Sequence, residues 1–296
     1  MKHLYTILLS LLFISSYAQT SENLFSRLSG IKNFDTYFYN IDGIEISYEP
    51  IDSEFSIKNI TKNFRKYSVK KQDLIIADSS LQMSNYYFGR SKTVCPGVIQ
   101  FTSYYFIQTN NNLLAFISFD MYNKSVPDFE RNFVNLIYNS AIPDSIYSPM
   151  RVEEVNFAGR EFPVANNCKW MGVNNLQCST FGQMNWSIHE SLEDAAKSVD
   201  EQFKTIEASN RGKFISEEIV DVIFEGENVK AKKAIYDVTG MSSVVVGMSG
   251  AKTLTVYFVA SPVRQNFVSC VLSFWNNDHI NQSGLPPLLE QVMQLK

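Results

Sequence analysis

The sequence lacks the short motifs that mark the common catalytic sites. It contains no G-x-S-x-G elbow, no S-x-x-K with its companion motifs and no H-E-x-x-H. Glycine-rich phosphate loops are missing too, because Gly240, Gly247 and Gly250 surround a short apolar run without a Rossmann unit around it. We therefore expect no cofactor and no catalytic role. These absences do not bear on a site assembled from distant carboxylates, which stays open as an alternative.

Metal-binding patterns are equally scarce. After residue 18 the chain has two histidines, His189 and His279, and neither has a second histidine at ligand spacing. His189 comes just before a predicted helix and His279 lies in a polar stretch, so we expect both to be exposed loop or cap residues. The four cysteines include no C-x-x-C pair. The sequence therefore predicts no metal site.

Clustered positive charge is also missing. The chain has 26 Lys and Arg against 30 Asp and Glu, and its formal net charge of −4 is spread without a long block of either sign. Nucleic-acid binding needs a basic patch or stripe. The densest basic spots, 62–71 and 230–233, are interpreted as solvated faces. We expect no nucleic acid partner.

Only one long apolar run occurs, and it lies at the N-terminus. Lys2 precedes the run 4–14, and Ser16-Tyr17-Ala18 puts small residues where a signal peptidase would cut, before Gln19. Residues 1–18 are therefore predicted to be the signal peptide of an exported protein, periplasmic or secreted. A short membrane anchor is the alternative, although the run is shorter than the about 20 residues that span a bilayer. No transmembrane segment is expected after signal cleavage.

The remainder of the chain contains an order of elements that occurs twice. In each half a serine, Ser56 or Ser191, is placed to cap a first helix, and a proline, Pro127 or Pro286, begins a closing helix. Strand-like runs surround these helices. They lie at 37–39, 44–48, 74–77, 86–88, 101–108 and 113–121 in the first half, and at 155–162, 184–188, 218–224, 231–238, 254–260 and 267–275 in the second.

A short stretch of similar sequence in each half supports the comparison of the halves. The runs 113–119 and 267–274 both end a buried strand on Ser-Phe, and a proline-led helix follows each. We therefore predict an α+β protein with two domains, 19–145 and 150–296, each an antiparallel β-sheet with packed helices. Proline and polar residues gather in 141–151, where we expect the boundary.

This order of hairpin, helix, strands and closing helix resembles the PsbP family. The similarity is closer in 155–295, where the start 191–196 looks like the family's first helix and the strand 267–275 looks like its last. Residues 35–140 resemble the family more loosely. The resemblance implies a PsbP-like α/β/α sandwich, present in tandem, and a binding or assembly role without catalysis. It assigns no site residue.

The cysteines predict one disulfide. Cys168 and Cys178 are close in sequence within a turn-rich stretch, and an exported setting permits their oxidation. A loop that small would stabilise the fold by roughly 2–3 kcal/mol. Two reduced thiols are the alternative. Cys270 is expected to be a buried thiol within a strand, Cys95 lies at a turn beside Pro96, and a bridge between these two has no local support.

Aromatic side chains are abundant, with 22 Phe and 15 Tyr, and several are consecutive. Neighbours in a strand point to opposite faces. Tyr86 and Phe88 should therefore share one face and Tyr87 the other, as Tyr104 and Phe106 do against Tyr105. We expect these residues to be core rather than a ligand platform, because both faces can be covered by helices or by the neighbouring domain.

Together these patterns predict an exported, non-catalytic binding or assembly protein of the bacterial cell envelope. Its partner is expected to be another protein or a small ligand. The alternative is a secreted hydrolase with dispersed carboxylates. Convergent Asp or Glu side chains in the largest cleft would favour the hydrolase, and an open apolar patch would favour the binding protein.

Overall fold

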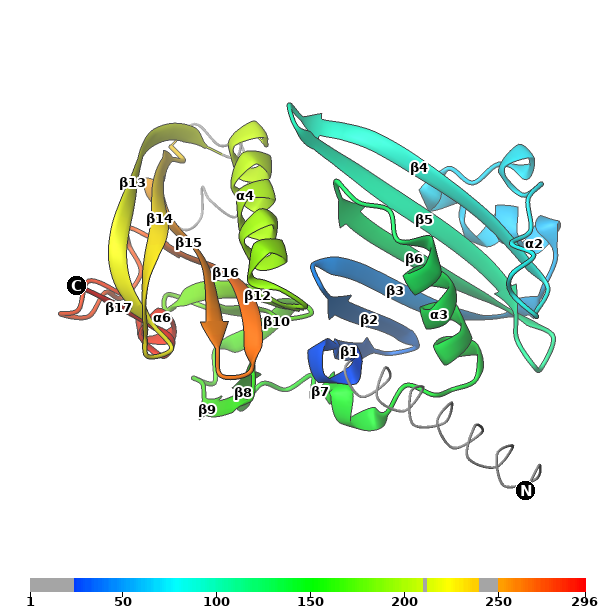
Figure 1. Cartoon of the computed structure of the whole chain (residues 1–296), viewed down its shortest axis with the longest axis horizontal. Helices are drawn as coiled ribbons and strands as arrows, with labels where there is room; N and C mark the ends of the chain where they lie inside the picture. Colours follow the sequence, from blue (N-terminus) through cyan, green and yellow to red (C-terminus); the bar gives the residue numbers. More distant parts are fainter. Residues whose placement is uncertain (1–23, 210–211, 240–249) are drawn as a thin grey trace, which may run out of the picture.

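In the computed structural model, residues 24–209, 212–239 and 250–296 are described. The predicted signal peptide, residues 1–18, lies outside the described residues, as does most of the glycine-flanked run 240–250. The chain is mostly β-sheet with few helices, and two large sheets lie side by side in a two-domain-like arrangement (Figure 1). The coarse α+β expectation is confirmed. No helix in the described ranges has the length and apolar character needed to cross a bilayer.

The first sheet has seven strands in the order β4-β5-β6-β3-β2-β1-β7. All neighbours are antiparallel except the short β7, which runs parallel to β1. Its strands are β1 (Ser29–Asn33), β2 (Thr36–Ile41), β3 (Ile44–Glu54), β4 (Asn85–Cys95), β5 (Val98–Gln108), β6 (Leu113–Tyr122) and β7 (Tyr147–Ser148).

Helices cover both faces of this sheet, but unequally. On one face α3 (Pro127–Tyr138) packs Phe133 and Ile137 against the alternate residues of β5 and β6 that include Tyr105 and Phe119. On the other face the short α2 (Ile57–Asn63) and the 3-10 turns η1 (Arg65–Tyr67) and η2 (Lys71–Asp73) cover one end only. The rest of that second face turns toward the other half of the chain.

The second sheet has eight strands in the order β10-β11-β12-β16-β15-β14-β13-β17. All its neighbouring strands are antiparallel. They are β10 (Cys168–Gly172), β11 (Asn175–Cys178), β12 (Gly182–His189), β13 (Lys213–Phe224), β14 (Glu227–Asp237), β15 (Thr253–Val263), β16 (Asn266–Trp275) and β17 (Met293–Leu295).

This sheet is also covered on both faces. The helix α4 (Leu192–Ala208), whose N-cap is Ser191, packs Phe203 against Val256, Phe258 and the rest of one apolar cluster. The opposite face packs against the hairpin of β8 (Glu154–Phe157) and β9 (Arg160–Pro163) and against α6 (Pro287–Glu290). A 3-10 turn, η3 (Asp144–Ile146), and β7 connect the halves.

The two sheets share one connectivity. In each, three strands precede a helix, the strands after the helix form a meander, and the last strand of that meander pairs with the strand just before the helix. These last strands are β6 and β16, the two segments whose sequences echo one another. The second half differs by one extra meander strand. The repeated order predicted from the sequence is thus present in the topology.

Two expected elements are wrong. Residues 74–77 form no strand: only Leu74 is buried, Ile75 and Ile76 are exposed, and a single backbone bond from Tyr87 to the Ile76 carbonyl ties the segment to β4. The closing helix of the second half is the short α6, and the apolar residues after it continue as β17 along β13. Pairing with an open sheet edge buries those residues as well as a helix would.

Candidate binding cleft between the two sheets

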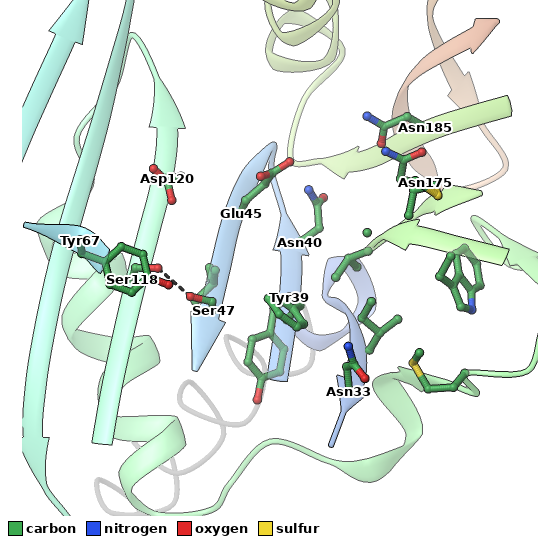
Figure 2. A pocket seen from close by; sticks show the side chains of 18 residues that line it. Asn33, Tyr39, Asn40, Glu45, Ser47, Tyr67, Ser118, Asp120, Asn175 and Asn185 are labelled. Atoms are coloured by element: carbon green, nitrogen blue, oxygen red, sulfur yellow. Dashed lines mark hydrogen bonds between the residues drawn. The ribbon is translucent and has the colours of Figure 1, made fainter. Parts of the chain in front are cut away.

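A cleft of about 500 Å³ lies between the two halves. Its floor is the uncovered end of the first sheet, formed by β2, β3 and β6, and its opposite wall is the β10–β11 hairpin with β12 (Figure 2). Polar residues and a few large apolar ones line it: Asn33, Phe38, Asn40, Glu45, Ser47, Tyr67, Ser118, Asp120, Met150, Trp170, Met171, Asn175 and Asn185, with parts of neighbouring residues.

The floor is built from two rows of side chains that cross the strands. Strand register places Asn40 opposite Glu45, Glu45 opposite Asp120, and Asp120 opposite Thr102. Directly paired residues lie on the same face, so these four form one continuous polar row from β2 to β5. They alternate along each strand with residues of the α3-facing core, such as Ile46.

The next row is less polar. Phe38 is paired with Ser47, Ser47 with Ser118, and Ser118 with Tyr104. The two serine hydroxyls are hydrogen-bonded to each other at 2.7 Å, as Figure 2 shows. This row therefore separates the polar row from the aromatic cluster beneath α2.

The two carboxylates of the polar row lie in an electrostatically unfavourable place. Partial desolvation in the cleft raises the pKa of Glu45, and the nearby charge of Asp120 raises it further. Burial also raises the pKa of Asp120, although its Oδ1 accepts hydrogen bonds from Thr102 Oγ1 at 2.5 Å and from Gln100 Nε2 at 3.1 Å, which act in the opposite direction. Glu45 keeps an exposed side chain, so water reaches it from the cleft. No Lys or Arg is among the described residues that line the cleft.

Asn40 adds an unmatched hydrogen-bonding group to this row. Only 6% of its surface is exposed, and its Oδ1 has no donor among the described residues. A buried polar atom without a partner is unfavourable by about 1–3 kcal/mol. The Asn40 side chain lies between Glu45 and the opposite wall (Figure 2). The side chain lines the cavity, but this oxygen is closed to solvent, so a bound molecule would reach it once the amide turns.

The opposite wall is a hairpin held by a disulfide. Cys168 and Cys178 are paired residues of β10 and β11, their Cα atoms are 3.9 Å apart, and they form the expected disulfide. The hairpin is also tied to the connecting segment, since Trp170 Nε1 donates to the Pro149 carbonyl at 3.0 Å. Asn175, at its far end, accepts a bond from Gln183 Nε2 at 2.8 Å. The disulfide thus fixes the segment that carries the second wall.

A smaller cavity of about 210 Å³ continues from the cleft toward α4. It shares Asn40, Glu45, Asp120 and Asn185 with the larger cavity, and Ser198 and Gln202 of α4 line its far side. The polar row is therefore reached from both cavities.

The two halves are joined beside this smaller cavity. The Asp42 N–H donates to the Ile188 carbonyl at 3.0 Å, and Asn123 Nδ2 donates to Glu201 Oε1 at 2.9 Å. The Asp42-Gly43 hairpin turn requires a positive φ at both residues, and a Cβ at Gly43 would come within 3.3 Å of the His189 ring. These contacts fix the spacing of the cleft walls.

His189 is buried at this junction, which corrects the expectation that it is exposed. It ends β12 with 2% of its surface exposed, and its Nε2 shares a 2.8 Å hydrogen bond with Ser269 Oγ, while Nδ1 has no partner among the described residues. The alternating pattern of β12 extends one residue further than the sequence suggested. His279 is exposed, as expected.

The other predicted residues have simpler outcomes. Cys95 and Cys270 are both buried and unpaired, so they do not form a bridge with each other. The consecutive aromatics are core, as expected: Tyr86, Phe88 and Phe106 pack beneath α2, whereas Tyr87 and Tyr105 pack beneath α3. No cluster of three or more metal-ligating side chains exists within residues 24–209, 212–239 and 250–296.

Sequence reasoning missed Glu45 and Asp120. Asp120 is the single charged residue of β6, Glu45 shares its side of β3 with Glu49, and the two cleft carboxylates are 75 positions apart. A charged residue inside an otherwise core-like strand was the available signal. The pairing of β3 with β6, which brings these residues together, could not be predicted from the sequence.

Comparison with known proteins identifies no relative. No family model matches the chain, and no curated protein matches it. Among solved structures, the di-domain ARO/CYC StfQ from the steffimycin biosynthetic pathway is similar with a TM-score of 0.16 and 10% sequence identity, over 90% of this chain and 77% of that chain. A TM-score that low does not indicate a shared fold.

Proposed function

We propose that this chain is an exported, non-catalytic binding protein that holds a polar ligand in the cleft between its two sheets. The observation that carries the proposal is Asn40, a buried side chain whose amide oxygen has no donor among the described residues, in a polar row at the floor of the cleft. The cavity's volume of about 500 Å³ lies within the range of small-molecule sites. A ligand that donates to this oxygen would remove an unfavourable burial.

The proposal also includes export and a relation to the PsbP family. The N-terminal pattern of residues 1–18 supports export, and the Cys168–Cys178 disulfide is compatible with an oxidising compartment. The repeated order of strands and helices supports a relation of each half to the PsbP-like α/β/α sandwich, whose members are mostly binding and assembly factors. The N-terminal pattern and the disulfide also support a location in the bacterial cell envelope.

Hydrolysis is the second candidate, since two carboxylates converge in this cleft. An acid–base pair works best when its environment moves the two pKa values apart. Here desolvation raises the pKa of both Glu45 and Asp120, and this common direction assigns neither of them an acid or a base role. Binding therefore agrees better with the geometry.

Hydrogen–deuterium exchange of the mature chain, with and without an extract of small molecules from the native envelope, tests the binding proposal. We expect protection in β2, β3, β6 and the β10–β11 hairpin. Asn185→Trp, which fills the cleft from the second wall, should abolish this protection, whereas Gln177→Trp, on the same sheet outside the cleft, should retain it. Protection that survives Asn185→Trp would refute the cleft as the site.

The hydrolase alternative has a different readout. Turnover of a hydrolase substrate panel that is lost in both Glu45→Gln and Asp120→Asn, while Asp128→Asn retains it, would replace binding with catalysis as the function. Asp128 is an exposed acid on α3, on the opposite face of the same sheet. We expect no such turnover.

A further inference from the structure

The two halves of the chain, which stand side by side in Figure 1, meet at a hollow and polar junction. The cleft of about 500 Å³ and the smaller cavity of about 210 Å³ both lie between the halves. Around them, direct contact consists mainly of β12 against β2 and of α4 against β4 and β5. An interface that is neither large nor apolar permits the halves to move relative to each other.

His189 belongs to the second half but is covered by the first. It ends β12, and the Asp42-Gly43 turn between β2 and β3 lies against its ring, because a Cβ at Gly43 would come within 3.3 Å of it. Beside the ring, the Asp42 N–H donates to the Ile188 carbonyl at 3.0 Å. Only 2% of the His189 surface is exposed. Separation of the halves would therefore expose the imidazole to water.

The closed junction accommodates a neutral imidazole better than an imidazolium. The Nε2 of His189 shares a 2.8 Å hydrogen bond with Ser269 Oγ, and Nδ1 has no partner among the described residues. An imidazolium donates from both ring nitrogens. Its Nδ1–H would therefore be buried without an acceptor, which is unfavourable for any donor and more so for one that carries charge.

The charged groups that face the ring do not compensate for a positive charge. On the turn, Asp42 has both carboxylate oxygens bonded to Arg27, at 3.0 and 3.1 Å. Lys124, after β6, brings a second cation and donates to the Asp42 carbonyl at 2.7 Å. On α4, Asp194 accepts a hydrogen bond within its own helix cap, β16 has no charged residue, and Glu190, next to the ring in sequence, is exposed. Two carboxylates and two cations balance, so an imidazolium would add an unmatched charge.

Protonation of the ring and opening of the junction are therefore linked. Burial lowers the pKa of His189 from 6.5 to about 4, and opening would return the ring to water and to its usual pKa. The ratio of open to closed molecules should then rise by about 150-fold between pH 7.5 and pH 4. At still lower pH the same shift allows a rise of at most about 300-fold.

We infer that the junction is a pH-sensitive contact: protonation of His189 releases the Asp42-Gly43 turn, and the two halves, each still folded, move apart about the connecting segment 149–153. The walls of the cleft belong to opposite halves, so they separate when the junction opens. Opening needs no ligand, so its failure would leave the proposed binding function untouched.

Small-angle X-ray scattering of the mature chain between pH 7.5 and pH 4 tests the inference. Size-exclusion chromatography in line with the measurement removes aggregates that form near the pI of about 5.5. We expect the radius of gyration to increase as the pH falls, while the far-UV circular dichroism stays unchanged. NMR titration of the His189 ring, one of two histidine rings after residue 18, should show protonation in the same pH interval.

Variants assign the opening to this residue. His189→Gln can still bond with Ser269 but does not titrate, so its radius of gyration should keep the closed value down to pH 4. His189→Asn makes the same test with a smaller side chain, and melting temperatures at pH 7.5 establish that each variant folds. His279→Gln removes an exposed histidine and should open as the wild type does. Other groups at the junction, such as Glu201, titrate in all of these proteins.

Four results would overturn the inference. The first is a radius of gyration that stays constant to pH 4 in the wild type. The second is an equal increase in the wild type and in the His189 variants, which would assign the opening to other titrating groups. The third is an increase that coincides with loss of circular dichroism, because a half would then unfold. The fourth needs no variant: it is expansion of the wild type while NMR shows the His189 ring still neutral.

Discussion

Buried His189 should make the stability of this protein fall as the pH falls below 7. Burial lowers the pKa of His189 from 6.5 to about 4, with Lys124 and Arg27 acting in the same direction and Asp42 and Asp194 opposing them. In the unfolded chain the ring is solvated and keeps its usual pKa. The folded state therefore binds fewer protons than the unfolded state across this interval.

The sign and size of the effect follow from linkage. Because the folded pKa is depressed, the contribution of His189 to stability is complete above about pH 6.5 and is lost as the pH falls toward 4. A shift of 2.5 units corresponds to about 3 kcal/mol in full, since each unit is about 1.4 kcal/mol. Between pH 7 and pH 5 the expected loss is about 2 kcal/mol.

The measurement is urea unfolding of the wild-type chain and of His189→Gln at several pH values between 5 and 7.5. Glutamine can still bond with Ser269 but does not titrate, so the free energy of unfolding of the variant should lack this part of the pH dependence. Other groups titrate equally in both proteins, and their effects cancel in the difference. The control, His279→Gln, removes an exposed histidine away from the junction and should leave the wild-type slope unchanged. Parallel curves for the wild type and His189→Gln would refute the reasoning.

Three further predictions concern other parts of the molecule. Replacing Cys168 and Cys178 together by serine should lower the free energy of unfolding by about 3 kcal/mol and loosen the hairpin wall, seen as faster amide exchange in β10 and β11. Glu130 is fully buried among Ser103 and Tyr105, and burial raises its pKa, so Glu130→Gln should stabilise the fold by about 1 kcal/mol at pH 8, and urea unfolding should show this advantage shrinking as the pH falls toward 4. Limited proteolysis should cut first within 141–151, and an earlier cut in 70–120 or 215–275 would contradict the predicted domain boundary.

Local patterns were sufficient to predict most elements. The Ser56 and Ser191 caps each accept a bond from the backbone N–H three residues on, and the helices begin where the serines indicated. Alternation of apolar and polar residues located most of the strands because one face of each is core. The run 74–77 was predicted to be a strand because it is apolar, but it forms no strand pairing. Hydrophobic periodicity does not show which segments pair.

The cleft could not be predicted in the same way, since it depends on register between distant strands. Cys168 and Cys178 were found because they are neighbours along the chain. Glu45 and Asp120 meet only because β6 returns to pair with β3, and desolvation in the folded chain raises the pKa of each. No local pattern contains that information.

A difference between the two repeats explains why the cleft lies where it does. In each half the helix that follows the third strand of the repeat packs on the same topological face of its sheet, but α4 has 17 residues and α2 has 7. At about 1.5 Å per residue, α4 is about 25 Å long and packs across β12, β15 and β16, whereas α2 is about 10 Å long and covers only the aromatic end of the first sheet. The polar row of Asn40, Glu45 and Asp120 occupies the part that α2 does not reach, and β12 and α4 of the second half stand over it. A shortened helix in one copy of a repeated fold thus leaves a sheet face uncovered, and the other copy closes it into a site.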